Sequence, residues 1–202
     1  MSAINDAYRE EAPPPQVEAA PALTAPATPQ ISPYEERMQQ ASAALQGSNW
    51  DESIRLVQEA ISHNASNPKG YALLGVAYLY GKKNVNAAAT AYRGALEHNG
   101  AVPFLVNHDH GQMPVFSNVC EGKLFVTPLG LTFQSADSTH NFEVAKKDLN
   151  EIATNGVMGV NVSAFHLKVN QPGGKPINYN FAPGTGRKDE VNLLISLVQS
   201  LK

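Results

Sequence analysis

The sequence predicts an α+β protein built from three segments: a disordered tail at residues 1–33, two α-helical hairpins at 34–100, and an antiparallel β domain at 101–202 that ends in a helix. Proline and alanine dominate the first segment. Apolar residues recur at helical spacing in the second segment and alternate with small or polar residues through much of the third. A chain of 202 residues is long enough for both folded segments to form ordinary domains.

The tail prediction rests on proline-rich runs such as 12–15 and 21–29. Proline removes backbone donors and blocks helices, and few large apolar groups are present to offset the entropy of ordering the chain. The first 30 residues also lack the basic start and apolar core of a secretory signal. No run approaches the roughly 18 apolar residues of a membrane span. A cytoplasmic protein is the expectation.

Charge is distributed unevenly along the chain. The formal net charge is −3, and residues 1–33 hold one basic and four acidic residues. Residues 34–100 hold six charges of each sign, and residues 101–202 hold eight of each. Balanced domains give no electrostatic reason to expect nucleic acid or an anionic membrane as a partner. The single cysteine, Cys120, excludes an internal disulfide and suits a reduced, buried thiol.

Four helices are expected between residues 33 and 100, because start and stop signals alternate there. The stretch 32–35 has the pattern of a capping box with proline in the first turn. Asparagine caps are expected at Asn49, Asn67 and Asn84. The helices should end near Gln46, Asn64, Gly81 and Gly100. In the second helix, the expected buried stripe is Ile54, Val57 and Ile61.

The two hairpins repeat. Small residues recur seven positions apart in the second helix of each hairpin, as Ser53 with Ala60 and Ala88 with Ala95. Ala60 and Ala95 are 35 residues apart, close to the tetratricopeptide period of about 34. The second hairpin resembles that family's packing signature through Tyr71, Leu74, Gly75, Tyr78, Ala88, Tyr92 and Ala95. The first departs from the signature, with Arg37, Gln40, Ala41 and Ala44 at the first four places.

The resemblance, which covers about 34–100, implies that the inner face of each hairpin's first helix contacts a peptide. By spacing, this face consists of Met38, Ser42, Leu45, Ala72, Val76, Leu79 and Tyr80. The lysine and asparagine pair of chaperone-binding members is missing, because Met38 and Ser42 occupy those places. The apolar face suits an amphipathic helix or apolar peptide. The alternative is that these residues pack on the β domain or on a second copy of the chain.

Two repeats bury little surface by themselves, so we expect the β domain, a homo-oligomer mate or a partner to cover their open end. The link near 98–101 is very short. It predicts that the helical hairpins dock on the β domain rather than tumble freely.

Period-two runs separated by turn residues predict roughly seven strands in 101–202. The apolar runs are Val102–Val106, Leu124–Val126, Leu129–Phe133, Phe142–Val144, Phe165–Val169 and Ile177–Phe181. A helix is expected from about Arg187, with Val191, Leu194, Ile195 and Val198 on one stripe.

This order of elements resembles the pleckstrin-homology superfold, in which the helix plugs one end of a bent antiparallel barrel. The segments 122–133, 142–144 and 148–149 are also similar to the strands of bacterial GRAM-like and pleckstrin-homology-like domains. In members that bind phosphoinositides, lysine and arginine surround the loop after the first strand. Here that loop, about 107–119, contains neither. Phosphoinositide binding is therefore not expected, and membrane-surface recruitment is the weakest alternative.

Three histidines and the cysteine form a candidate metal site. His108 and His110 alternate along an expected strand, so they would share one face. Cys120 opens the next strand, and His140 belongs to a later hairpin. Imidazole and thiolate are ligands that suit zinc. The alternative is that these histidines are hydrogen-bonded loop or surface groups.

Enzymatic signatures are absent from the sequence: there is no phosphate loop, no Gly-x-Ser-x-Gly elbow and no His-Glu-x-x-His. A Cys120 nucleophile would lack a recognisable oxyanion hole or orienting group. The sequence therefore predicts a non-enzymatic adaptor or scaffold, without a cofactor, that binds a protein or peptide through its repeats. A metal-binding or ligand-sensing module is the alternative.

Overall fold

The computed structural model describes residues 31–111, 118–155 and 163–201, which belong to one compact unit spanning Ile31–Lys202. Residues 1–30 of the tail predicted over 1–33 lie outside the described residues, and its expected end needs correction, because Ser32 caps the first helix and Pro33 begins it. No helix within the described ranges is both long enough and apolar enough to cross a membrane.

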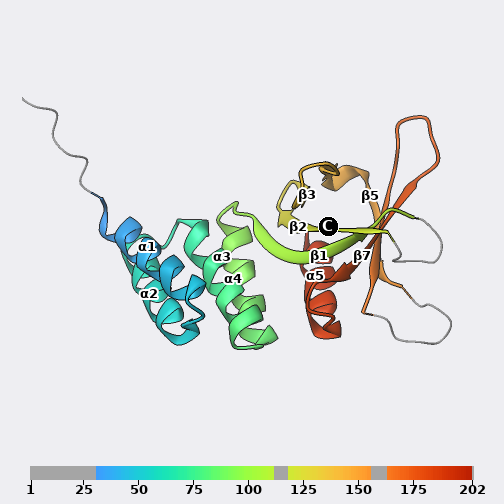
Figure 1. The fold of residues 1–202 in the computed structure, drawn as a ribbon. Coiled ribbons are helices and arrows are strands. Elements are labelled where there is room, and N and C mark those ends of the chain that lie inside the picture. The colour runs from blue at the N-terminus through green and yellow to red at the C-terminus, as the bar shows by residue number, and fades with distance from the viewer. Residues whose placement is uncertain (1–30, 112–117, 156–162, 202) are drawn as a thin grey trace, which may run out of the picture. The chain divides into compact units, whose positions relative to one another are not determined.

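Two helical hairpins open the described chain (Figure 1). Their helices are α1 (Pro33–Gln46), α2 (Trp50–His63), α3 (Pro68–Val76) and α4 (Val85–Glu97). The capping box is confirmed, because the Ser32 hydroxyl accepts from the Glu35 amide while the Glu35 carboxylate accepts from the Ser32 amide. Asn67 and Asn84 also cap their helices through side-chain oxygens, whereas Asn49 makes no side-chain cap bond.

The third helix departs from the expected single α-helix. It changes at Ala77 into one π-helical turn, η1 (Ala77–Gly81), which ends at the predicted stop. Gly81 lies against the indole of Trp50, and a Cβ added there would lie 2.2 Å from Trp50 Cδ2. Only glycine therefore permits this approach between the first and second hairpins.

The buried face of α2 differs from the expected stripe. Ser53, Leu56, Val57 and Ala60 are buried, while Ile54 and Ile61 are only half-buried. The Ser53 hydroxyl donates to the Ala41 carbonyl of α1, at 3.0 Å from its oxygen. Val57 of the expected stripe is therefore buried as predicted, and it packs with Leu56 and with Ala41 of α1.

The rest of the chain forms a seven-stranded antiparallel sheet followed by helix α5 (Lys188–Ser200), as predicted (Figure 1). The strands are β1 (Val102–Asp109), β2 (Val119–Thr127), β3 (Gly130–Ser135), β4 (Phe142–Ala145), β5 (Leu149–Thr154), β6 (Phe165–Val169) and β7 (Ile177–Pro183). A short 3-10 turn, η2 (Lys146–Asp148), joins β4 to β5. The sheet order is β4-β3-β2-β1-β7-β6-β5, so β1 is central and β4 and β5 are the edges.

Two strand expectations need correction. Leu129 was expected on a strand, but it lies in the β2–β3 turn and is 83% exposed. Strand β1 ends at Asp109, so His108 lies on the strand as expected, whereas His110, also expected there, lies just beyond its end.

One apolar core joins the second hairpin to the β domain. It includes Leu79 and Tyr92 from the helical part, Phe104 and Phe181 from the sheet, and Leu197 from α5. The rings of Tyr92 and Phe104 meet edge to face, with centroids 5.4 Å apart. A smaller separate cluster, Ala41, Leu56 and Val57, holds the first hairpin. The predicted docking on the β domain is therefore confirmed for the second hairpin.

Polar bonds complete this junction. The Tyr80 hydroxyl donates to Glu190 Oε1 (2.8 Å) and accepts from the Leu105 amide (2.9 Å). The Arg187 guanidinium donates to the Leu79 carbonyl at 3.0 Å. Glu190 is almost fully buried, at 1% exposure.

Candidate functional site

The docking divides the residues expected to form one peptide groove. Leu79 is wholly buried and so is not accessible to a partner, while the half-buried Tyr80 is hydrogen-bonded to the β domain through its hydroxyl. Ala72 is half-buried and packs against the main core. Val76 and Tyr80 line a pocket of about 280 Å³ whose other wall is Pro103, Leu105, Lys123 and Phe125.

The α1 part of the expected set remains accessible. Met38 and Ser42 line an open groove of about 540 Å³, which we call the α1 groove. Its other lining residues are Ser32, Tyr34, Glu35, Gln39, Ala43, Gln46, Asn64, Asn67 and Lys69. Leu45 is half-buried and does not line it.

Most side chains that line the α1 groove are polar. Glu35 is held by the Ser32 amide and hydroxyl, and these two hydrogen bonds, with a smaller effect of Lys69, lower the pKa of the carboxyl. The Asn67 side chain accepts from the Lys69 amide at 3.1 Å and so caps α3. Sequence reasoning missed Glu35, Asn67 and Lys69 as lining residues. It did place Glu35 at the start of the first helix and Asn67 at the start of the third.

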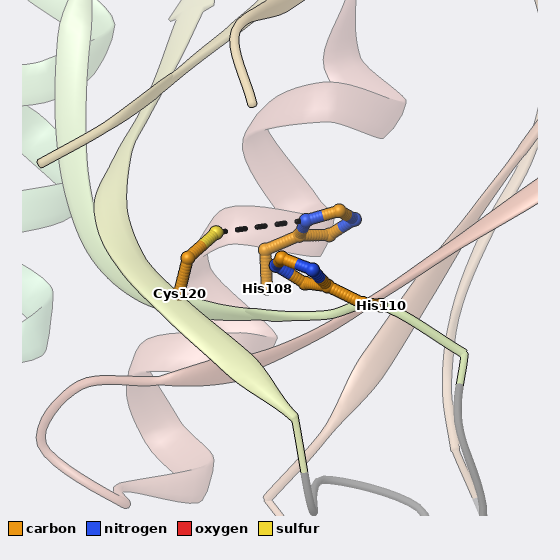
Figure 2. A group of neighbouring side chains, drawn as sticks. All are labelled: His108, His110 and Cys120. Carbon is orange, nitrogen blue, oxygen red and sulfur yellow. Dashed lines mark hydrogen bonds between the residues drawn. The ribbon is translucent and has the colours of Figure 1, made fainter. Parts of the chain in front are cut away.

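The second candidate lies in the β domain, where neighbouring strands bring His108 and Cys120 together. These residues are direct partners in the β1–β2 register. His108 is buried, on the same face as Phe104 and Val106, and its Nδ1 lies 3.9 Å from Cys120 Sγ (Figure 2).

His110 completes a group of three. Its ring centroid lies 5.3 Å from that of His108, and the backbone bond from its amide to the Asn118 carbonyl fixes the chain just beyond β1. One ligand atom from each of His108, His110 and Cys120 lies within 4.8 Å of the other two. His140, the fourth sequence candidate, is outside this group, but its ring centroid is only 4.1 Å from that of His110.

The environment of the cluster is aromatic. The His108 ring contacts Phe133, Phe142, Tyr179 and Phe181, at centroid distances of 5.0 to 6.0 Å. Burial, with the charges of His110 and His140, lowers the pKa of His108 to about 4. Burial and then the charge of Asp137 raise the pKa of the Cys120 thiol. His108 is therefore neutral at pH 7, and the thiol keeps its proton unless a cation lies beside it.

No family model matches the chain, and no curated protein matches it. Solved structures match over part of its length. The C-terminal domain of an unknown protein from Leishmania infantum is 20% identical, with a TM-score of 0.38, and the match covers 48% of this chain and 81% of that chain. The N-terminal PH domain of human ARAP2 is 10% identical, with a TM-score of 0.38, and the match covers 50% and 77%.

A third match is to the DH/PH fragment of PDZRHOGEF in the complex with human RhoA. It is 9% identical, has a TM-score of 0.39, and covers 81% of this chain and 59% of that chain. The fold is assigned from the strand order and register of the chain itself, and not from these distant matches.

Proposed function

We propose that this chain is a non-enzymatic adaptor that holds a peptide segment of a protein partner in the α1 groove. The observation that carries the proposal is the division of the helical face. The β domain packs on the second hairpin, where Leu79 is buried and the Tyr80 hydroxyl is bonded to Glu190, while the α1 groove stays open. A fixed platform with one open groove is the arrangement that a peptide-binding module needs.

The lining defines the chemistry of the peptide. Met38 and Ala43 offer apolar contact along α1, and Asn64, Asn67 and Lys69, from the α2–α3 connection and the start of α3, offer amide and ammonium groups. A volume of about 540 Å³ accommodates a few residues. The expected ligand therefore presents an apolar side chain to Met38 and an acceptor or acidic group to Lys69.

The Cys120–His108 pair supports a non-enzymatic reading. A catalytic cysteine needs a lowered pKa and a histidine that carries charge beside it. Here the pKa of the thiol is raised and that of the imidazole is lowered, which is the opposite arrangement.

The test begins with a displayed library of random peptides selected on the purified full chain. For a selected peptide, Met38→Glu should weaken binding at least tenfold in fluorescence anisotropy. The reason is that the peptide would bury the Met38 side chain, and this burial contributes about 1.5 kcal/mol or more to binding. The control is Gln58→Glu, an exposed change on α2, which should leave the Kd within about twofold. Equal binding by the Met38→Glu variant would place the ligand elsewhere, and no enriched peptide at all would refute the adaptor function.

A further inference from the structure

We propose that the β domain binds one transition-metal ion, of which zinc is the expected species, through His108, His110 and Cys120, with His140 supplying the fourth ligand. The site is separate from the α1 groove and goes beyond the proposed peptide binding. It draws on two sheet strands and on the β3–β4 turn.

The first argument is distance. Tetrahedral zinc holds thiolate sulfur at about 2.3 Å and imidazole nitrogen at about 2.0–2.1 Å, so its ligand atoms lie about 3.3–3.6 Å apart. The three donors here lie within 4.8 Å of one another, and the His108 Nδ1–Cys120 Sγ distance is 3.9 Å. The β1–β2 register fixes the positions of His108 and Cys120, and the bond from the His110 amide to the Asn118 carbonyl holds His110 just beyond β1.

The second argument is an unsatisfied atom. The Nε2 atom of His110 is buried and makes no hydrogen bond to the described part of the chain. A buried polar atom without a partner costs about 1–3 kcal/mol. A metal ion at the centre of the three donors would accept its lone pair, and Figure 2 shows the His110 ring beside that of His108.

The third argument concerns His140. Asp137 Oδ1 accepts hydrogen bonds from the Thr139 amide (3.1 Å) and hydroxyl (2.8 Å). The Thr139 hydroxyl lies 2.8 Å from His140 Nδ1. Since that hydroxyl gives its proton to Asp137, its oxygen accepts from Nδ1–H, and the lone pair of His140 is then on Nε2. Carboxylate support of this kind orients metal-binding histidines in proteins.

The donor set selects the metal class. Three imidazoles and one thiolate suit zinc and its spectroscopic substitute cobalt(II), whereas calcium and magnesium prefer oxygen ligands. The phenyl and phenol rings around His108 exclude water from one side of the ion. On binding, the Cys120 thiol loses its proton to solvent and the thiolate sulfur donates to the metal, so no oxidant or reductant is required.

The test is titration of the metal-free full chain with cobalt(II), followed by displacement with zinc. The wild type should bind one equivalent, with tetrahedral d–d bands and a thiolate-to-cobalt charge-transfer band. Cys120→Ser should abolish the charge-transfer band and weaken binding at least tenfold. Thr139→Val should weaken binding tenfold to a hundredfold while keeping that band, as expected of a supporting residue. The matched control is His63→Ala, an exposed histidine on α2, which should leave the titration unchanged.

Circular dichroism of each variant establishes that it is folded. Two results would overturn the proposal: a wild-type titration without a charge-transfer band, or retention of full cobalt affinity by a folded Cys120→Ser protein. His110→Ala is a second test: this variant should bind cobalt(II) more weakly although Cys120 is still present.

Discussion

At the residue scale, the Tyr80 hydroxyl connects three segments of the chain. It donates to Glu190 in α5 and accepts from the Leu105 amide in β1, while its own backbone belongs to the π-helical turn η1. The helical spacing that predicted a groove position for Tyr80 was insufficient to reveal this, because the partners lie 25 and 110 residues away. A long-range contact of this kind leaves no local pattern in the sequence.

Replacing Tyr80 with phenylalanine should lower the free energy of unfolding by about 1–3 kcal/mol, because the change leaves the Leu105 amide and a buried carboxylate oxygen without their partner. Urea denaturation measures the difference. Tyr78→Phe is the control, since the Tyr78 ring is half-buried and its hydroxyl makes no hydrogen bond within the described chain. Equal loss in both variants would mean that the Tyr80 hydroxyl contributes nothing specific.

The carboxyl of Glu190 should make stability depend on pH. Burial raises the pKa of Glu190 by more than the hydrogen bonds from Thr185 and Tyr80 and the charge of Arg187 lower it. Between the ordinary pKa and the raised one, the folded chain binds a proton that the unfolded chain has lost. Stability from this group is therefore complete below the ordinary pKa and is lost as pH rises through the raised value, by up to about 1.4 kcal/mol per pH unit.

Glu190→Gln removes this dependence and keeps an oxygen acceptor. The variant should gain stability relative to the wild type as pH rises from about 4 to 8 in urea titrations. Glu97→Gln, an exposed carboxyl at the end of α4, is the control and should show little change. A constant difference between Glu190→Gln and the wild type across this range would contradict a raised pKa.

At the element scale, the helix boundaries were predictable because their signals are local. Ser32 with Glu35, Asn67 and Asn84 all form the expected caps. The face that each helix buries was less predictable. In α2 the buried residues are Ser53, Leu56, Val57 and Ala60, so the expected stripe was right at Val57 and wrong at the half-buried Ile54 and Ile61. The small Ser53, which donates to the Ala41 carbonyl of α1, was missed because only large apolar residues were counted.

The α3–α4 crossing depends on Gly75. A Cβ at this position would lie 2.1 Å from Cδ1 of Tyr92, a fully buried ring. Gly75→Ala should therefore destabilise the chain by about 1–3 kcal/mol, even though alanine favours a helix by about 1 kcal/mol over glycine. Gly47→Ala is the control, because its nearest neighbours would lie at 3.6 Å and its φ is −77°. Thermal unfolding measures the midpoint temperature of each variant. An unchanged midpoint for Gly75→Ala would show that α3 and α4 can move apart without loss of stability.

The candidate metal site shows what strand periodicity can predict. Alternation suggested that His108 and His110 lie together and the order of strands that Cys120 is near, and ligand atoms of the three lie within 4.8 Å of one another, although His110 is beyond the end of β1. The register that sets His108 opposite Cys120, and the turn that brings His140 to His110, depend on pairing across the sheet. Sequence alone thus proposed the candidates but gave no distances.

At the scale of the whole molecule, the account depends on the second hairpin and the β domain sharing one core. Leu79, Tyr92 and Leu96 enter the same buried cluster as Phe104 and Leu197. Trp50 extends this connection to the first hairpin through its contact with Gly81. The short link predicted the docking, but not which face of α3 would be covered. The α1 groove is an open part of the helical face that the β domain does not line.

The most direct test is urea unfolding of the full chain followed by two probes. Fluorescence of Trp50, the single tryptophan, reports the helical hairpins, and pulsed hydrogen exchange of the amides in β6 reports the sheet. A shared core predicts coincident transitions with one midpoint. The contradicting result is a change in Trp50 fluorescence at a lower urea concentration, while the β6 amides stay protected. The hairpins would then be an independent unit, and the whole face from Met38 to Tyr80 would be available to a partner.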